Sequence, residues 1–121
     1  MSKVNLADKF AQFSEHWTPK IVGEANGQYI KLAKTLGEMV WHKHDAEDEI
    51  FLVVKGKLTI QLRDGDVELN AGEFYVVPKG VEHCPRSDAE VEMILIEPKQ
   101  TAHTGDLKNE MTVAIEKQEW I

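Results

Sequence analysis

The sequence predicts an all-β domain, an antiparallel sandwich or barrel preceded by one short helix. From Thr18 onward, short runs of β-branched and aliphatic residues are broken by Gly, Asn, Asp or Pro, which is typical of such folds. An Asp-Gly pair at 64–65 separates two of these runs, and apolar residues at helical spacing lie near the start. The 121 residues fit one domain, so we expect residues 1–121 to share a single core.

The first element is an amphipathic helix over about residues 6–14. Leu6, Phe10 and Phe13 fall at helical spacing and would lie on one face. Asn5 stands where a helix cap is expected, with an acidic residue three positions later.

The clearest hairpin joins predicted strands at 57–62 and 67–69 through a turn at 63–66. Asp-Gly suits the positive φ angles of a tight turn. Leu58, Ile60 and the apolar residue two positions later alternate with polar residues, so one face of the first strand is expected to be buried.

Further strands follow from the same pattern of apolar runs and turn residues. They are predicted at residues 73–77, 81–83, 91–97 and 111–115. The polar stretch 99–110 is expected to form a surface loop.

Composition excludes several function classes. With 21 acidic and 14 basic residues the formal net charge is -7, and the Lys and Arg residues do not cluster, which argues against a nucleic-acid partner. The longest apolar run, 50–54, is far too short to cross a membrane, and the N-terminus lacks the apolar core of a signal peptide. A single cysteine cannot form an internal disulfide, so we expect a cytoplasmic location.

Candidate metal ligands gather in the middle of the chain. His42 and His44 are two residues apart, which in an extended strand points both imidazoles to the same side. Glu49 opens the next apolar run and can lie beside them, and His83, after a Pro-Lys-Gly turn, can supply a fourth ligand. Asp48 fits the spacing from His44 as well as Glu49 does.

These residues resemble the two motifs of the cupin superfamily. The first motif, over 37–56, reads Gly37, His42, His44, Glu49 and Gly56. The second, over 72–87, reads Gly72, Pro78, Gly80 and His83. The spacer after Gly37 is four residues where five is usual, and Ser87 stands where the family commonly has Asn. The resemblance leaves the local turn at Gly37 and the packing near Ser87 undetermined.

The resemblance implies a double-stranded β-helix, the jelly-roll barrel of cupins, with one divalent metal ion held by His42, His44, Glu49 and His83. The six-residue distance to Gly56 favours Glu49 over Asp48. The ligand types do not select among Fe, Mn, Ni, Zn and Cu. A domain of this length needs no metal to fold, so we assign the ion to chemistry or ligand binding.

Residues near the ligands are expected to line a pocket. Met39, Trp41 and Phe51 are our candidates. Cys84 is expected to be a small buried side chain and not a nucleophile. Two further histidines lie outside both motifs and are expected at the surface or the barrel rim: His16 and His103.

An open metal site indicates a metal-dependent enzyme, with a dioxygenase-like, isomerase or lyase activity on a small, polar, oxygen-rich molecule. The alternative is a non-catalytic module that binds or senses a small ligand through its metal. A sugar phosphate is not expected, because the nearby basic residues, Lys43, Lys79 and Arg86, do not form a phosphate cradle. Many small cupins are dimers, and strand 50–54 is apolar on both faces, so we expect a homodimer.

Overall fold

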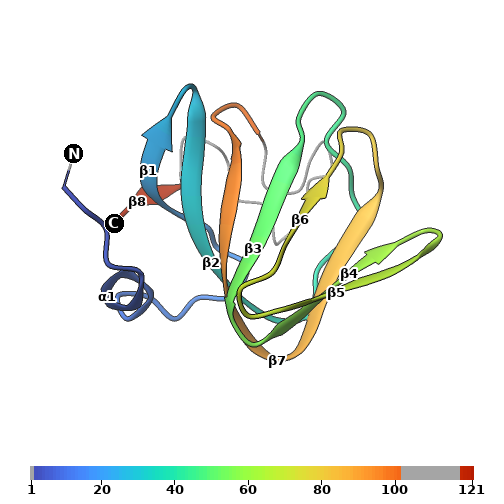
Figure 1. The fold of residues 1–121 in the computed structure, drawn as a ribbon, viewed down its shortest axis with the longest axis horizontal. Helices are drawn as coiled ribbons and strands as arrows, with labels where there is room; N and C mark the ends of the chain where they lie inside the picture. Colours follow the sequence, from blue (N-terminus) through green and yellow to red (C-terminus); the bar gives the residue numbers. More distant parts are fainter. Residues whose placement is uncertain (1, 102–117) are drawn as a thin grey trace.

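In the computed structural model, which describes residues 2–101 and 118–121, one short helix precedes a curved and largely antiparallel sheet (Figure 1). The elements are α1 Leu6–Phe10, β1 Lys20–Ala25, β2 Gln28–Glu38, β3 Glu49–Lys55, β4 Lys57–Leu62, β5 Gly65–Asn70, β6 Phe74–Val77, β7 His83–Pro98 and β8 Glu119–Trp120. The predicted all-β class with an N-terminal helix is confirmed. The predicted strand 111–115, most of the loop 99–110 and His103 lie outside the described residues.

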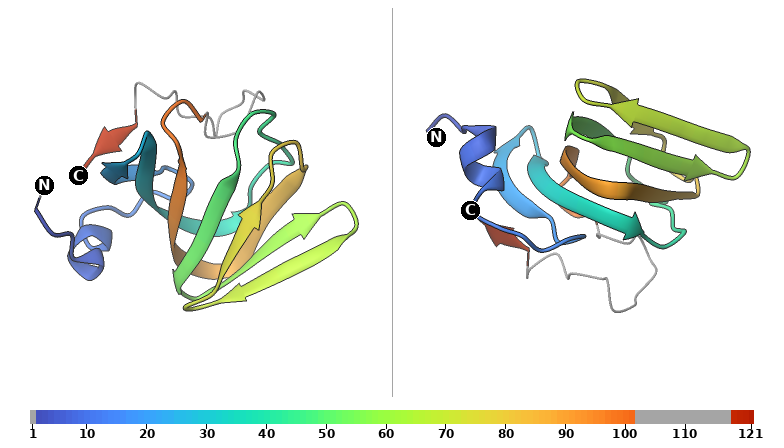
Figure 2. Two further views of the ribbon diagram at one scale, coloured as in Figure 1. Left: turned by 45° about the horizontal axis from the view of Figure 1, so that its top comes forward. Right: turned by 90° about the horizontal axis from the view of Figure 1, so that it is seen from below.

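The long strand β7 connects the parts of the sheet. Along one edge it pairs with β2, while its other edge pairs with β4 near His83 and with β3 near Met93. The sheet therefore runs in the order β5-β4-β7-β2-β1-β8, with β3 paired to β7 and β6 paired to β3 (Figure 2). Because β7 pairs with β2, β3 and β4, it holds these three strands around a common interior.

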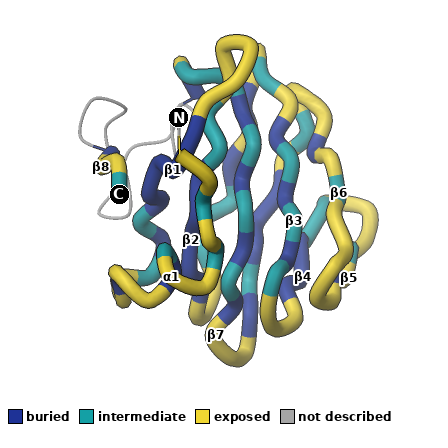
Figure 3. Tube along the Cα trace, turned by 60° about the vertical axis from the view of Figure 1, so that its left-hand side comes forward, coloured by how far each residue is buried: buried dark blue, intermediate teal, exposed yellow. Residues whose placement is uncertain are grey.

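Two hydrophobic clusters stabilise this arrangement. The larger one fills the interior of the barrel with residues from β2 to β7: Ala33, Phe51, Val53, Leu58, Ile60, Leu69, Val77, Val91, Met93 and Leu95. The smaller one joins the N-terminal region to the sheet: Phe10, Phe13, Val22 and Leu32. Buried residues follow the strands, and exposed residues concentrate in the connecting loops (Figure 3). None of the helices in the described part of the chain has the length and hydropathy needed to span a membrane.

The N-terminal helix is shorter than predicted. It begins as expected, with the Asn5 side chain accepting a hydrogen bond from the backbone N–H of Asp8 at 3.0 Å. It ends at Phe10 instead of residue 14. Lys34 Nζ donates to the carbonyl oxygen of Phe13 at 2.6 Å, so a tertiary contact satisfies a carbonyl that would have no partner in the last turn of a helix ending at residue 14.

Two hairpins show how turn residues set the strand boundaries. The predicted turn at 63–66 is only two residues long, because Leu62 pairs with Gly65 and the second strand begins there. A hairpin that we did not predict joins β1 to β2 through Asn26 and Gly27, with φ angles of 52° and 76°. Asn-Gly is a strong signal for this turn type.

The strands predicted at 81–83 and 91–97 were wrong as separate elements, because His83–Pro98 is one continuous strand. Pro85 lies within this strand. Its carbonyl oxygen accepts a hydrogen bond from the backbone N–H of Met39 at 2.9 Å, and it lies opposite Ile60. A proline can occupy a strand where its missing N–H is not needed.

The two departures from the family motifs lie opposite each other. Gly37 pairs with Ser87 across β2 and β7, next to a register shift between Thr35 and Gly37. Gly37 has a φ of 80°, and the hydroxyl groups of Thr35 and Ser87 lie 2.8 Å apart in the interior. Ser87 therefore has a buried hydrogen-bond partner, and Gly37 takes up the positive φ next to the irregularity in β2.

Replacing Gly56 with Ala is expected to lower the free energy of unfolding by about 2 to 4 kcal/mol. Gly56 has a φ of 95°, and an added Cβ would lie 3.0 Å from the carbonyl oxygen of Glu90 and 3.1 Å from Val91 Cγ2. Gly27→Ala is the matched control, since Gly27 also has a positive φ but has open space around it. Urea unfolding should show the control losing about 1 kcal/mol. Equal losses in the two variants would contradict the steric explanation.

Candidate metal centre

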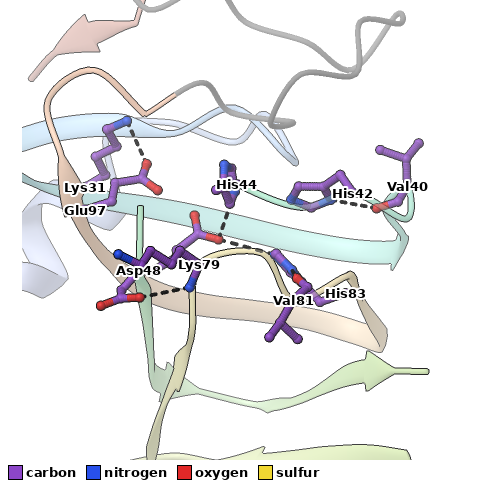
Figure 4. A network of polar contacts seen from close by, with 10 residues as sticks. Lys31, Val40, His42, His44, Asp48, Lys79, Val81, His83 and Glu97 are labelled. Carbon is purple, nitrogen blue, oxygen red and sulfur yellow. Dashed lines mark hydrogen bonds and ion pairs between the residues drawn. The ribbon is translucent and has the colours of Figure 1, made fainter. Parts of the chain in front are cut away.

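Four side chains from separate parts of the chain meet inside the barrel (Figure 4). His42 and His44 lie on the segment between β2 and β3. Glu49 is the first residue of β3, and His83 is the first residue of β7. The backbone N–H of His42 donates to the carbonyl oxygen of His83 at 3.0 Å, and the reverse bond is 2.9 Å long. This bridge holds the two motifs side by side.

We expected an extended strand at His42 and His44, but only the bridge between His42 and His83 has strand pairing. His42 pairs with His83, whereas the carbonyl oxygen of His44 accepts a hydrogen bond from the backbone N–H of Gly80 at 2.8 Å. The rest of the segment is irregular. The two imidazoles still lie close together, with ring centroids 5.1 Å apart.

The four side chains form a compact, buried group, which we call the metal cluster: His42, His44, Glu49 and His83. One ligand atom from each residue lies within 4.8 Å of those of the other three. Glu49 Oε1 lies 3.3 Å from His44 Nε2 and 3.4 Å from His83 Nε2. With metal bonds of about 2.1 Å, neighbouring octahedral ligands are roughly 3.0 Å apart and opposite ones roughly 4.2 Å. The cluster therefore fits one divalent ion after a small contraction.

Backbone carbonyl oxygens orient two of the imidazoles. His42 Nδ1 lies 2.8 Å from the carbonyl oxygen of Val40, and His83 Nδ1 lies 2.9 Å from that of Val81. A carbonyl can only accept, so each Nδ1 carries a proton and the neutral ring keeps its Nε2 lone pair for a metal. His83 Nε2 and Glu49 Oε1 are both buried electron-pair donors, and they repel each other unless a proton or a metal ion lies between them.

Behind the cluster, Glu49 contacts a second buried carboxyl group. Burial raises the pKa of Glu49, but a hydrogen bond from Glu97 and the nearby imidazoles of His44 and His83 outweigh this effect and hold that pKa well below its ordinary value. Burial and the Glu49 charge raise the pKa of Glu97 well above its ordinary value. Of the two carboxyl groups, Glu97 therefore keeps a proton more readily, and Glu49 more readily carries the negative charge. Lys31 Nζ donates to Glu97 Oε1 at 2.8 Å (Figure 4).

A cavity adjoins the cluster. Its volume is about 20 Å³, or about 320 Å³ when the open mouth is included. The residues that line it are Trp17, Pro19, Ala33, Met39, His42, Glu49, Phe51, Pro85, Met93 and Leu95. The candidates Met39 and Phe51 are among them. Trp41 is not, because its ring faces the guanidinium group of Arg63, 3.8 Å from the ring centroid.

Asp48, Lys43 and Cys84 lie near the metal ligands in sequence but do not belong to the cluster. Asp48 points away from the cluster and accepts a hydrogen bond from the backbone N–H of Lys79 at 2.8 Å. Lys43 pairs with Asp45 at 3.3 Å. Cys84 is buried as expected, and burial raises the pKa of its thiol to about 11, so it stays protonated at neutral pH.

Sequence reasoning missed Lys31 and Glu97. A signal for Glu97 was present, because it continues the alternation of Val91, Met93 and Leu95 along the inward face of β7. A carboxyl group in an otherwise apolar series of this kind indicates a buried polar partner.

Without metal, the protein is expected to lose about 3 kcal/mol of stability as the pH falls from about 6.5 to about 4. Burial, followed by the neighbouring charge of His83, lowers the pKa of His42 from 6.5 to about 4. Between these values the unfolded chain binds a proton at His42 that the folded chain does not, so unfolding is favoured; below pH 4 both states are protonated and this dependence ends. Urea unfolding at several pH values measures it. His42→Gln, which cannot take up this proton, should show a shallower decline, and an unchanged slope would contradict the assignment.

An all-β barrel with three imidazoles and one carboxylate in its interior defines a small protein built around a metal-capable site. The chain belongs to the cupin family: the family's cupin domain matches residues 29–106. This confirms the resemblance of the two motifs and the jelly-roll architecture that it implied.

Several known proteins are similar to this chain. The crystal structure of a cupin-2 domain containing protein from Shewanella frigidimarina has 47% sequence identity and a TM-score of 0.78, and the match covers 78% of this chain and 93% of that one. The uncharacterized protein YdbB of Bacillus subtilis is 33% identical over 114 residues, which are 93% of this chain and 87% of YdbB. Hydroquinone 1,2-dioxygenase from Sphingomonas sp. TTNP3, solved with 4-hydroxybenzoate bound, has a TM-score of 0.64 at 16% identity, covering 74% of this chain and 70% of that one. At this identity the likeness concerns the fold alone.

Proposed function

We propose that the protein is a metal-dependent enzyme that binds one divalent ion at the metal cluster and adds molecular oxygen to a small molecule with oxygen donors. The observation that carries this proposal is the buried cluster of three imidazoles and one carboxylate beside a cavity. A bound ion would keep about two of six octahedral positions for substrate or oxygen. Fe, Mn, Ni, Zn and Cu all accept this ligand set, and an oxidation selects a redox-active one.

Oxidation fits the cavity better than an isomerase or lyase step does. Those reactions need a group that moves a proton on the substrate. Among the described residues that line the cavity, the only ionisable side chains belong to the cluster, His42 and Glu49. A dioxygenase reaction adds both atoms of O₂ to the substrate and needs no external electron donor. Hydroquinone 1,2-dioxygenase provides a precedent for this chemistry on the same fold.

The alternative function is a non-catalytic module that binds or senses a small ligand through its metal. The same scarcity of acid and base groups along the described lining favours it. It differs from the enzyme in one measurable respect, because it binds its ligand without converting it.

Elemental analysis of untagged protein tests the metal site. We expect about one divalent ion per chain, and a large loss of metal in His42→Ala and in His83→Ala. Thermal melting of each variant shows whether the barrel is still folded. Full metal content in both folded variants would contradict the site.

Oxygen consumption tests the activity. Protein loaded in turn with Fe(II), Mn(II), Ni(II) and Cu(II) is mixed with catechols, flavonols, β-dicarbonyls and sugar acids. We expect metal-dependent oxygen uptake with at least one class, and none with metal-free protein. Tight binding without oxygen uptake or product would favour the binding module instead.

We also propose that the protein is a homodimer. In the described residues β6 pairs only with β3, and its side chains Phe74 and Val76 are 63% and 38% exposed. A second copy of this edge would cover these apolar side chains. Light scattering on the purified protein measures the mass, and a monomer at micromolar concentration would contradict the proposal.

A further inference from the structure

The cavity beside the metal cluster differs in character from the cluster itself. Eight of its ten lining residues are apolar or aromatic, and the other two, His42 and Glu49, belong to the cluster. Oxygen donors of a ligand therefore find a partner only at the metal end. The remainder of the ligand meets carbon and sulfur atoms on every described side.

The buried cations near the interior are already engaged. Lys31 Nζ donates to Glu97 at 2.8 Å, and Lys20 Nζ donates to Glu15 at 3.1 Å. Neither lysine lines the cavity. A second carboxylate, a phosphate or a set of hydroxyl groups on the ligand would lose its hydration without gaining a partner, at a cost of several kcal/mol.

The dimensions of the cavity favour a flat and slender ligand. A volume of about 20 Å³ is close to that of one water position, so a larger ligand must displace side chains. Two of the lining residues are methionines, whose unbranched side chains adapt easily: Met39, half-buried on the segment after β2, and Met93 on β7. Phe51 and Trp17 add aromatic rings to the lining, and aromatic rings pack well against a planar body.

We propose that the ligand of the metal site is an amphiphilic molecule with a single flat apolar ring and two adjacent oxygen donors at one end. The donors bind the metal, and the ring lies between Met39, Phe51 and Met93. This inference rests on the metal site of the proposed function, and it narrows the expected oxygen-rich molecule to one whose oxygens are confined to one end. Polyhydroxylated acids and molecules with a second charge are excluded.

A matched pair of probes tests the inference without any turnover. Both 4-methylcatechol and 3,4-dihydroxybenzoate carry the same two adjacent hydroxyl groups, but the second has a carboxylate where the first has a methyl group. Zn(II)-loaded protein is titrated with each probe by calorimetry under nitrogen, and each affinity is divided by that of the probe for free Zn²⁺. We expect 4-methylcatechol to bind at least about tenfold more tightly, because an unpaired charge is costly to bury. Equal affinities, a preference for 3,4-dihydroxybenzoate, or no binding of either probe would overturn the inference.

A cation placed in the lining of the cavity should offset the preference for 4-methylcatechol. Met39→Lys adds an ammonium group to the half-buried lining, and we expect the relative affinity for 3,4-dihydroxybenzoate to rise by about tenfold. Leu36→Lys is the control, since Leu36 is 45% exposed and does not line the cavity. The control should leave the ratio unchanged. An equal rise in both variants would assign the effect to overall charge and would contradict the proposed position of the ring.

The failure of this inference can be told apart from the failure of the proposed function. A protein that binds Zn(II) and prefers 4-methylcatechol, but consumes no oxygen with any redox metal, retains the inferred ligand class and loses the enzymatic activity. A protein that consumes oxygen but shows no preference between the probes retains the activity and loses the inferred ligand class.

Discussion

Replacing Glu49 with Gln is expected to lower the affinity for a divalent metal ion by at least about 100-fold. Glu49 is the only carboxylate of the metal cluster, and its Oε1 atom lies within 3.4 Å of two imidazole nitrogens. Gln keeps the size of the side chain but removes the negative charge that attracts the ion. Residues that merely orient metal ligands contribute about 10–100-fold to affinity, so a direct ligand is expected to reach or exceed the upper limit.

Asp48→Asn is the matched control for this substitution. Asp48 satisfies the same spacing from His44 in the sequence, and it also loses one charge when changed to its amide. Its Oδ1 atom accepts a hydrogen bond from the backbone of Lys79, which Asn can still accept. Competition with a coloured chelator should show the metal affinity of this variant changing by less than about twofold. A large loss of metal affinity in Asp48→Asn together with a small loss in Glu49→Gln would show that Asp48, and not Glu49, is the carboxylate ligand.

The members of the metal cluster could be predicted because short-range spacing determines much of the site. His42 and His44 are two residues apart on an extended segment, and Glu49 follows after one turn. His83 lies far away in sequence, and only the resemblance to the family motifs placed it with the others. Its position in the structure depends on the backbone bridge between His42 and His83, which no local pattern encodes.

The surroundings of the cluster could not be predicted in the same way. The separate strands predicted at 81–83 and 91–97 did not show the continuity of β7, which contributes Met93 and Leu95 to the cavity and Glu97 to the region behind Glu49. The cavity is formed by β2, β3, β7 and the segments between elements, so its apolar character depends on which faces turn inward together. Strand pairings between distant residues determine which faces turn inward, whereas the sequence pattern predicts each strand separately.

Lys31 and Glu97 form the most deeply buried contact between a lysine and a carboxyl group among the described residues. Their side chains are 1% and 2% exposed, and Lys31 Nζ lies 2.8 Å from Glu97 Oε1. Glu97 in turn contacts Glu49, so Lys31 balances the charge that these two carboxyl groups share. An unbalanced negative charge in this region would be poorly solvated. Lys31 therefore supports both the fold and the orientation of Glu49.

The Lys31→Met variant is expected to lose about 2 to 3 kcal/mol of unfolding free energy in the metal-free protein, because a charge-assisted hydrogen bond is removed in the interior. The metal affinity should fall by about tenfold, because Glu97 loses the group that orients it towards Glu49. Urea unfolding and chelator competition measure the two effects. Because the variant also binds metal about tenfold more weakly, its loss of stability should be about 1.4 kcal/mol larger when metal is saturating.

Lys57→Met is the control for the same substitution at the surface. Lys57 pairs with Glu68 at 3.3 Å on the β4–β5 hairpin, but the two side chains are 56% and 59% exposed. Exposed pairs contribute about 0–1 kcal/mol, so this variant should stay within about 1 kcal/mol of the unaltered protein. The contrast isolates burial, since both changes remove one lysine charge. Equal stability and equal metal affinity of Lys31→Met and Lys57→Met would contradict this role of Lys31. Glu97 would then keep its position without Lys31, and packing alone would support Glu49.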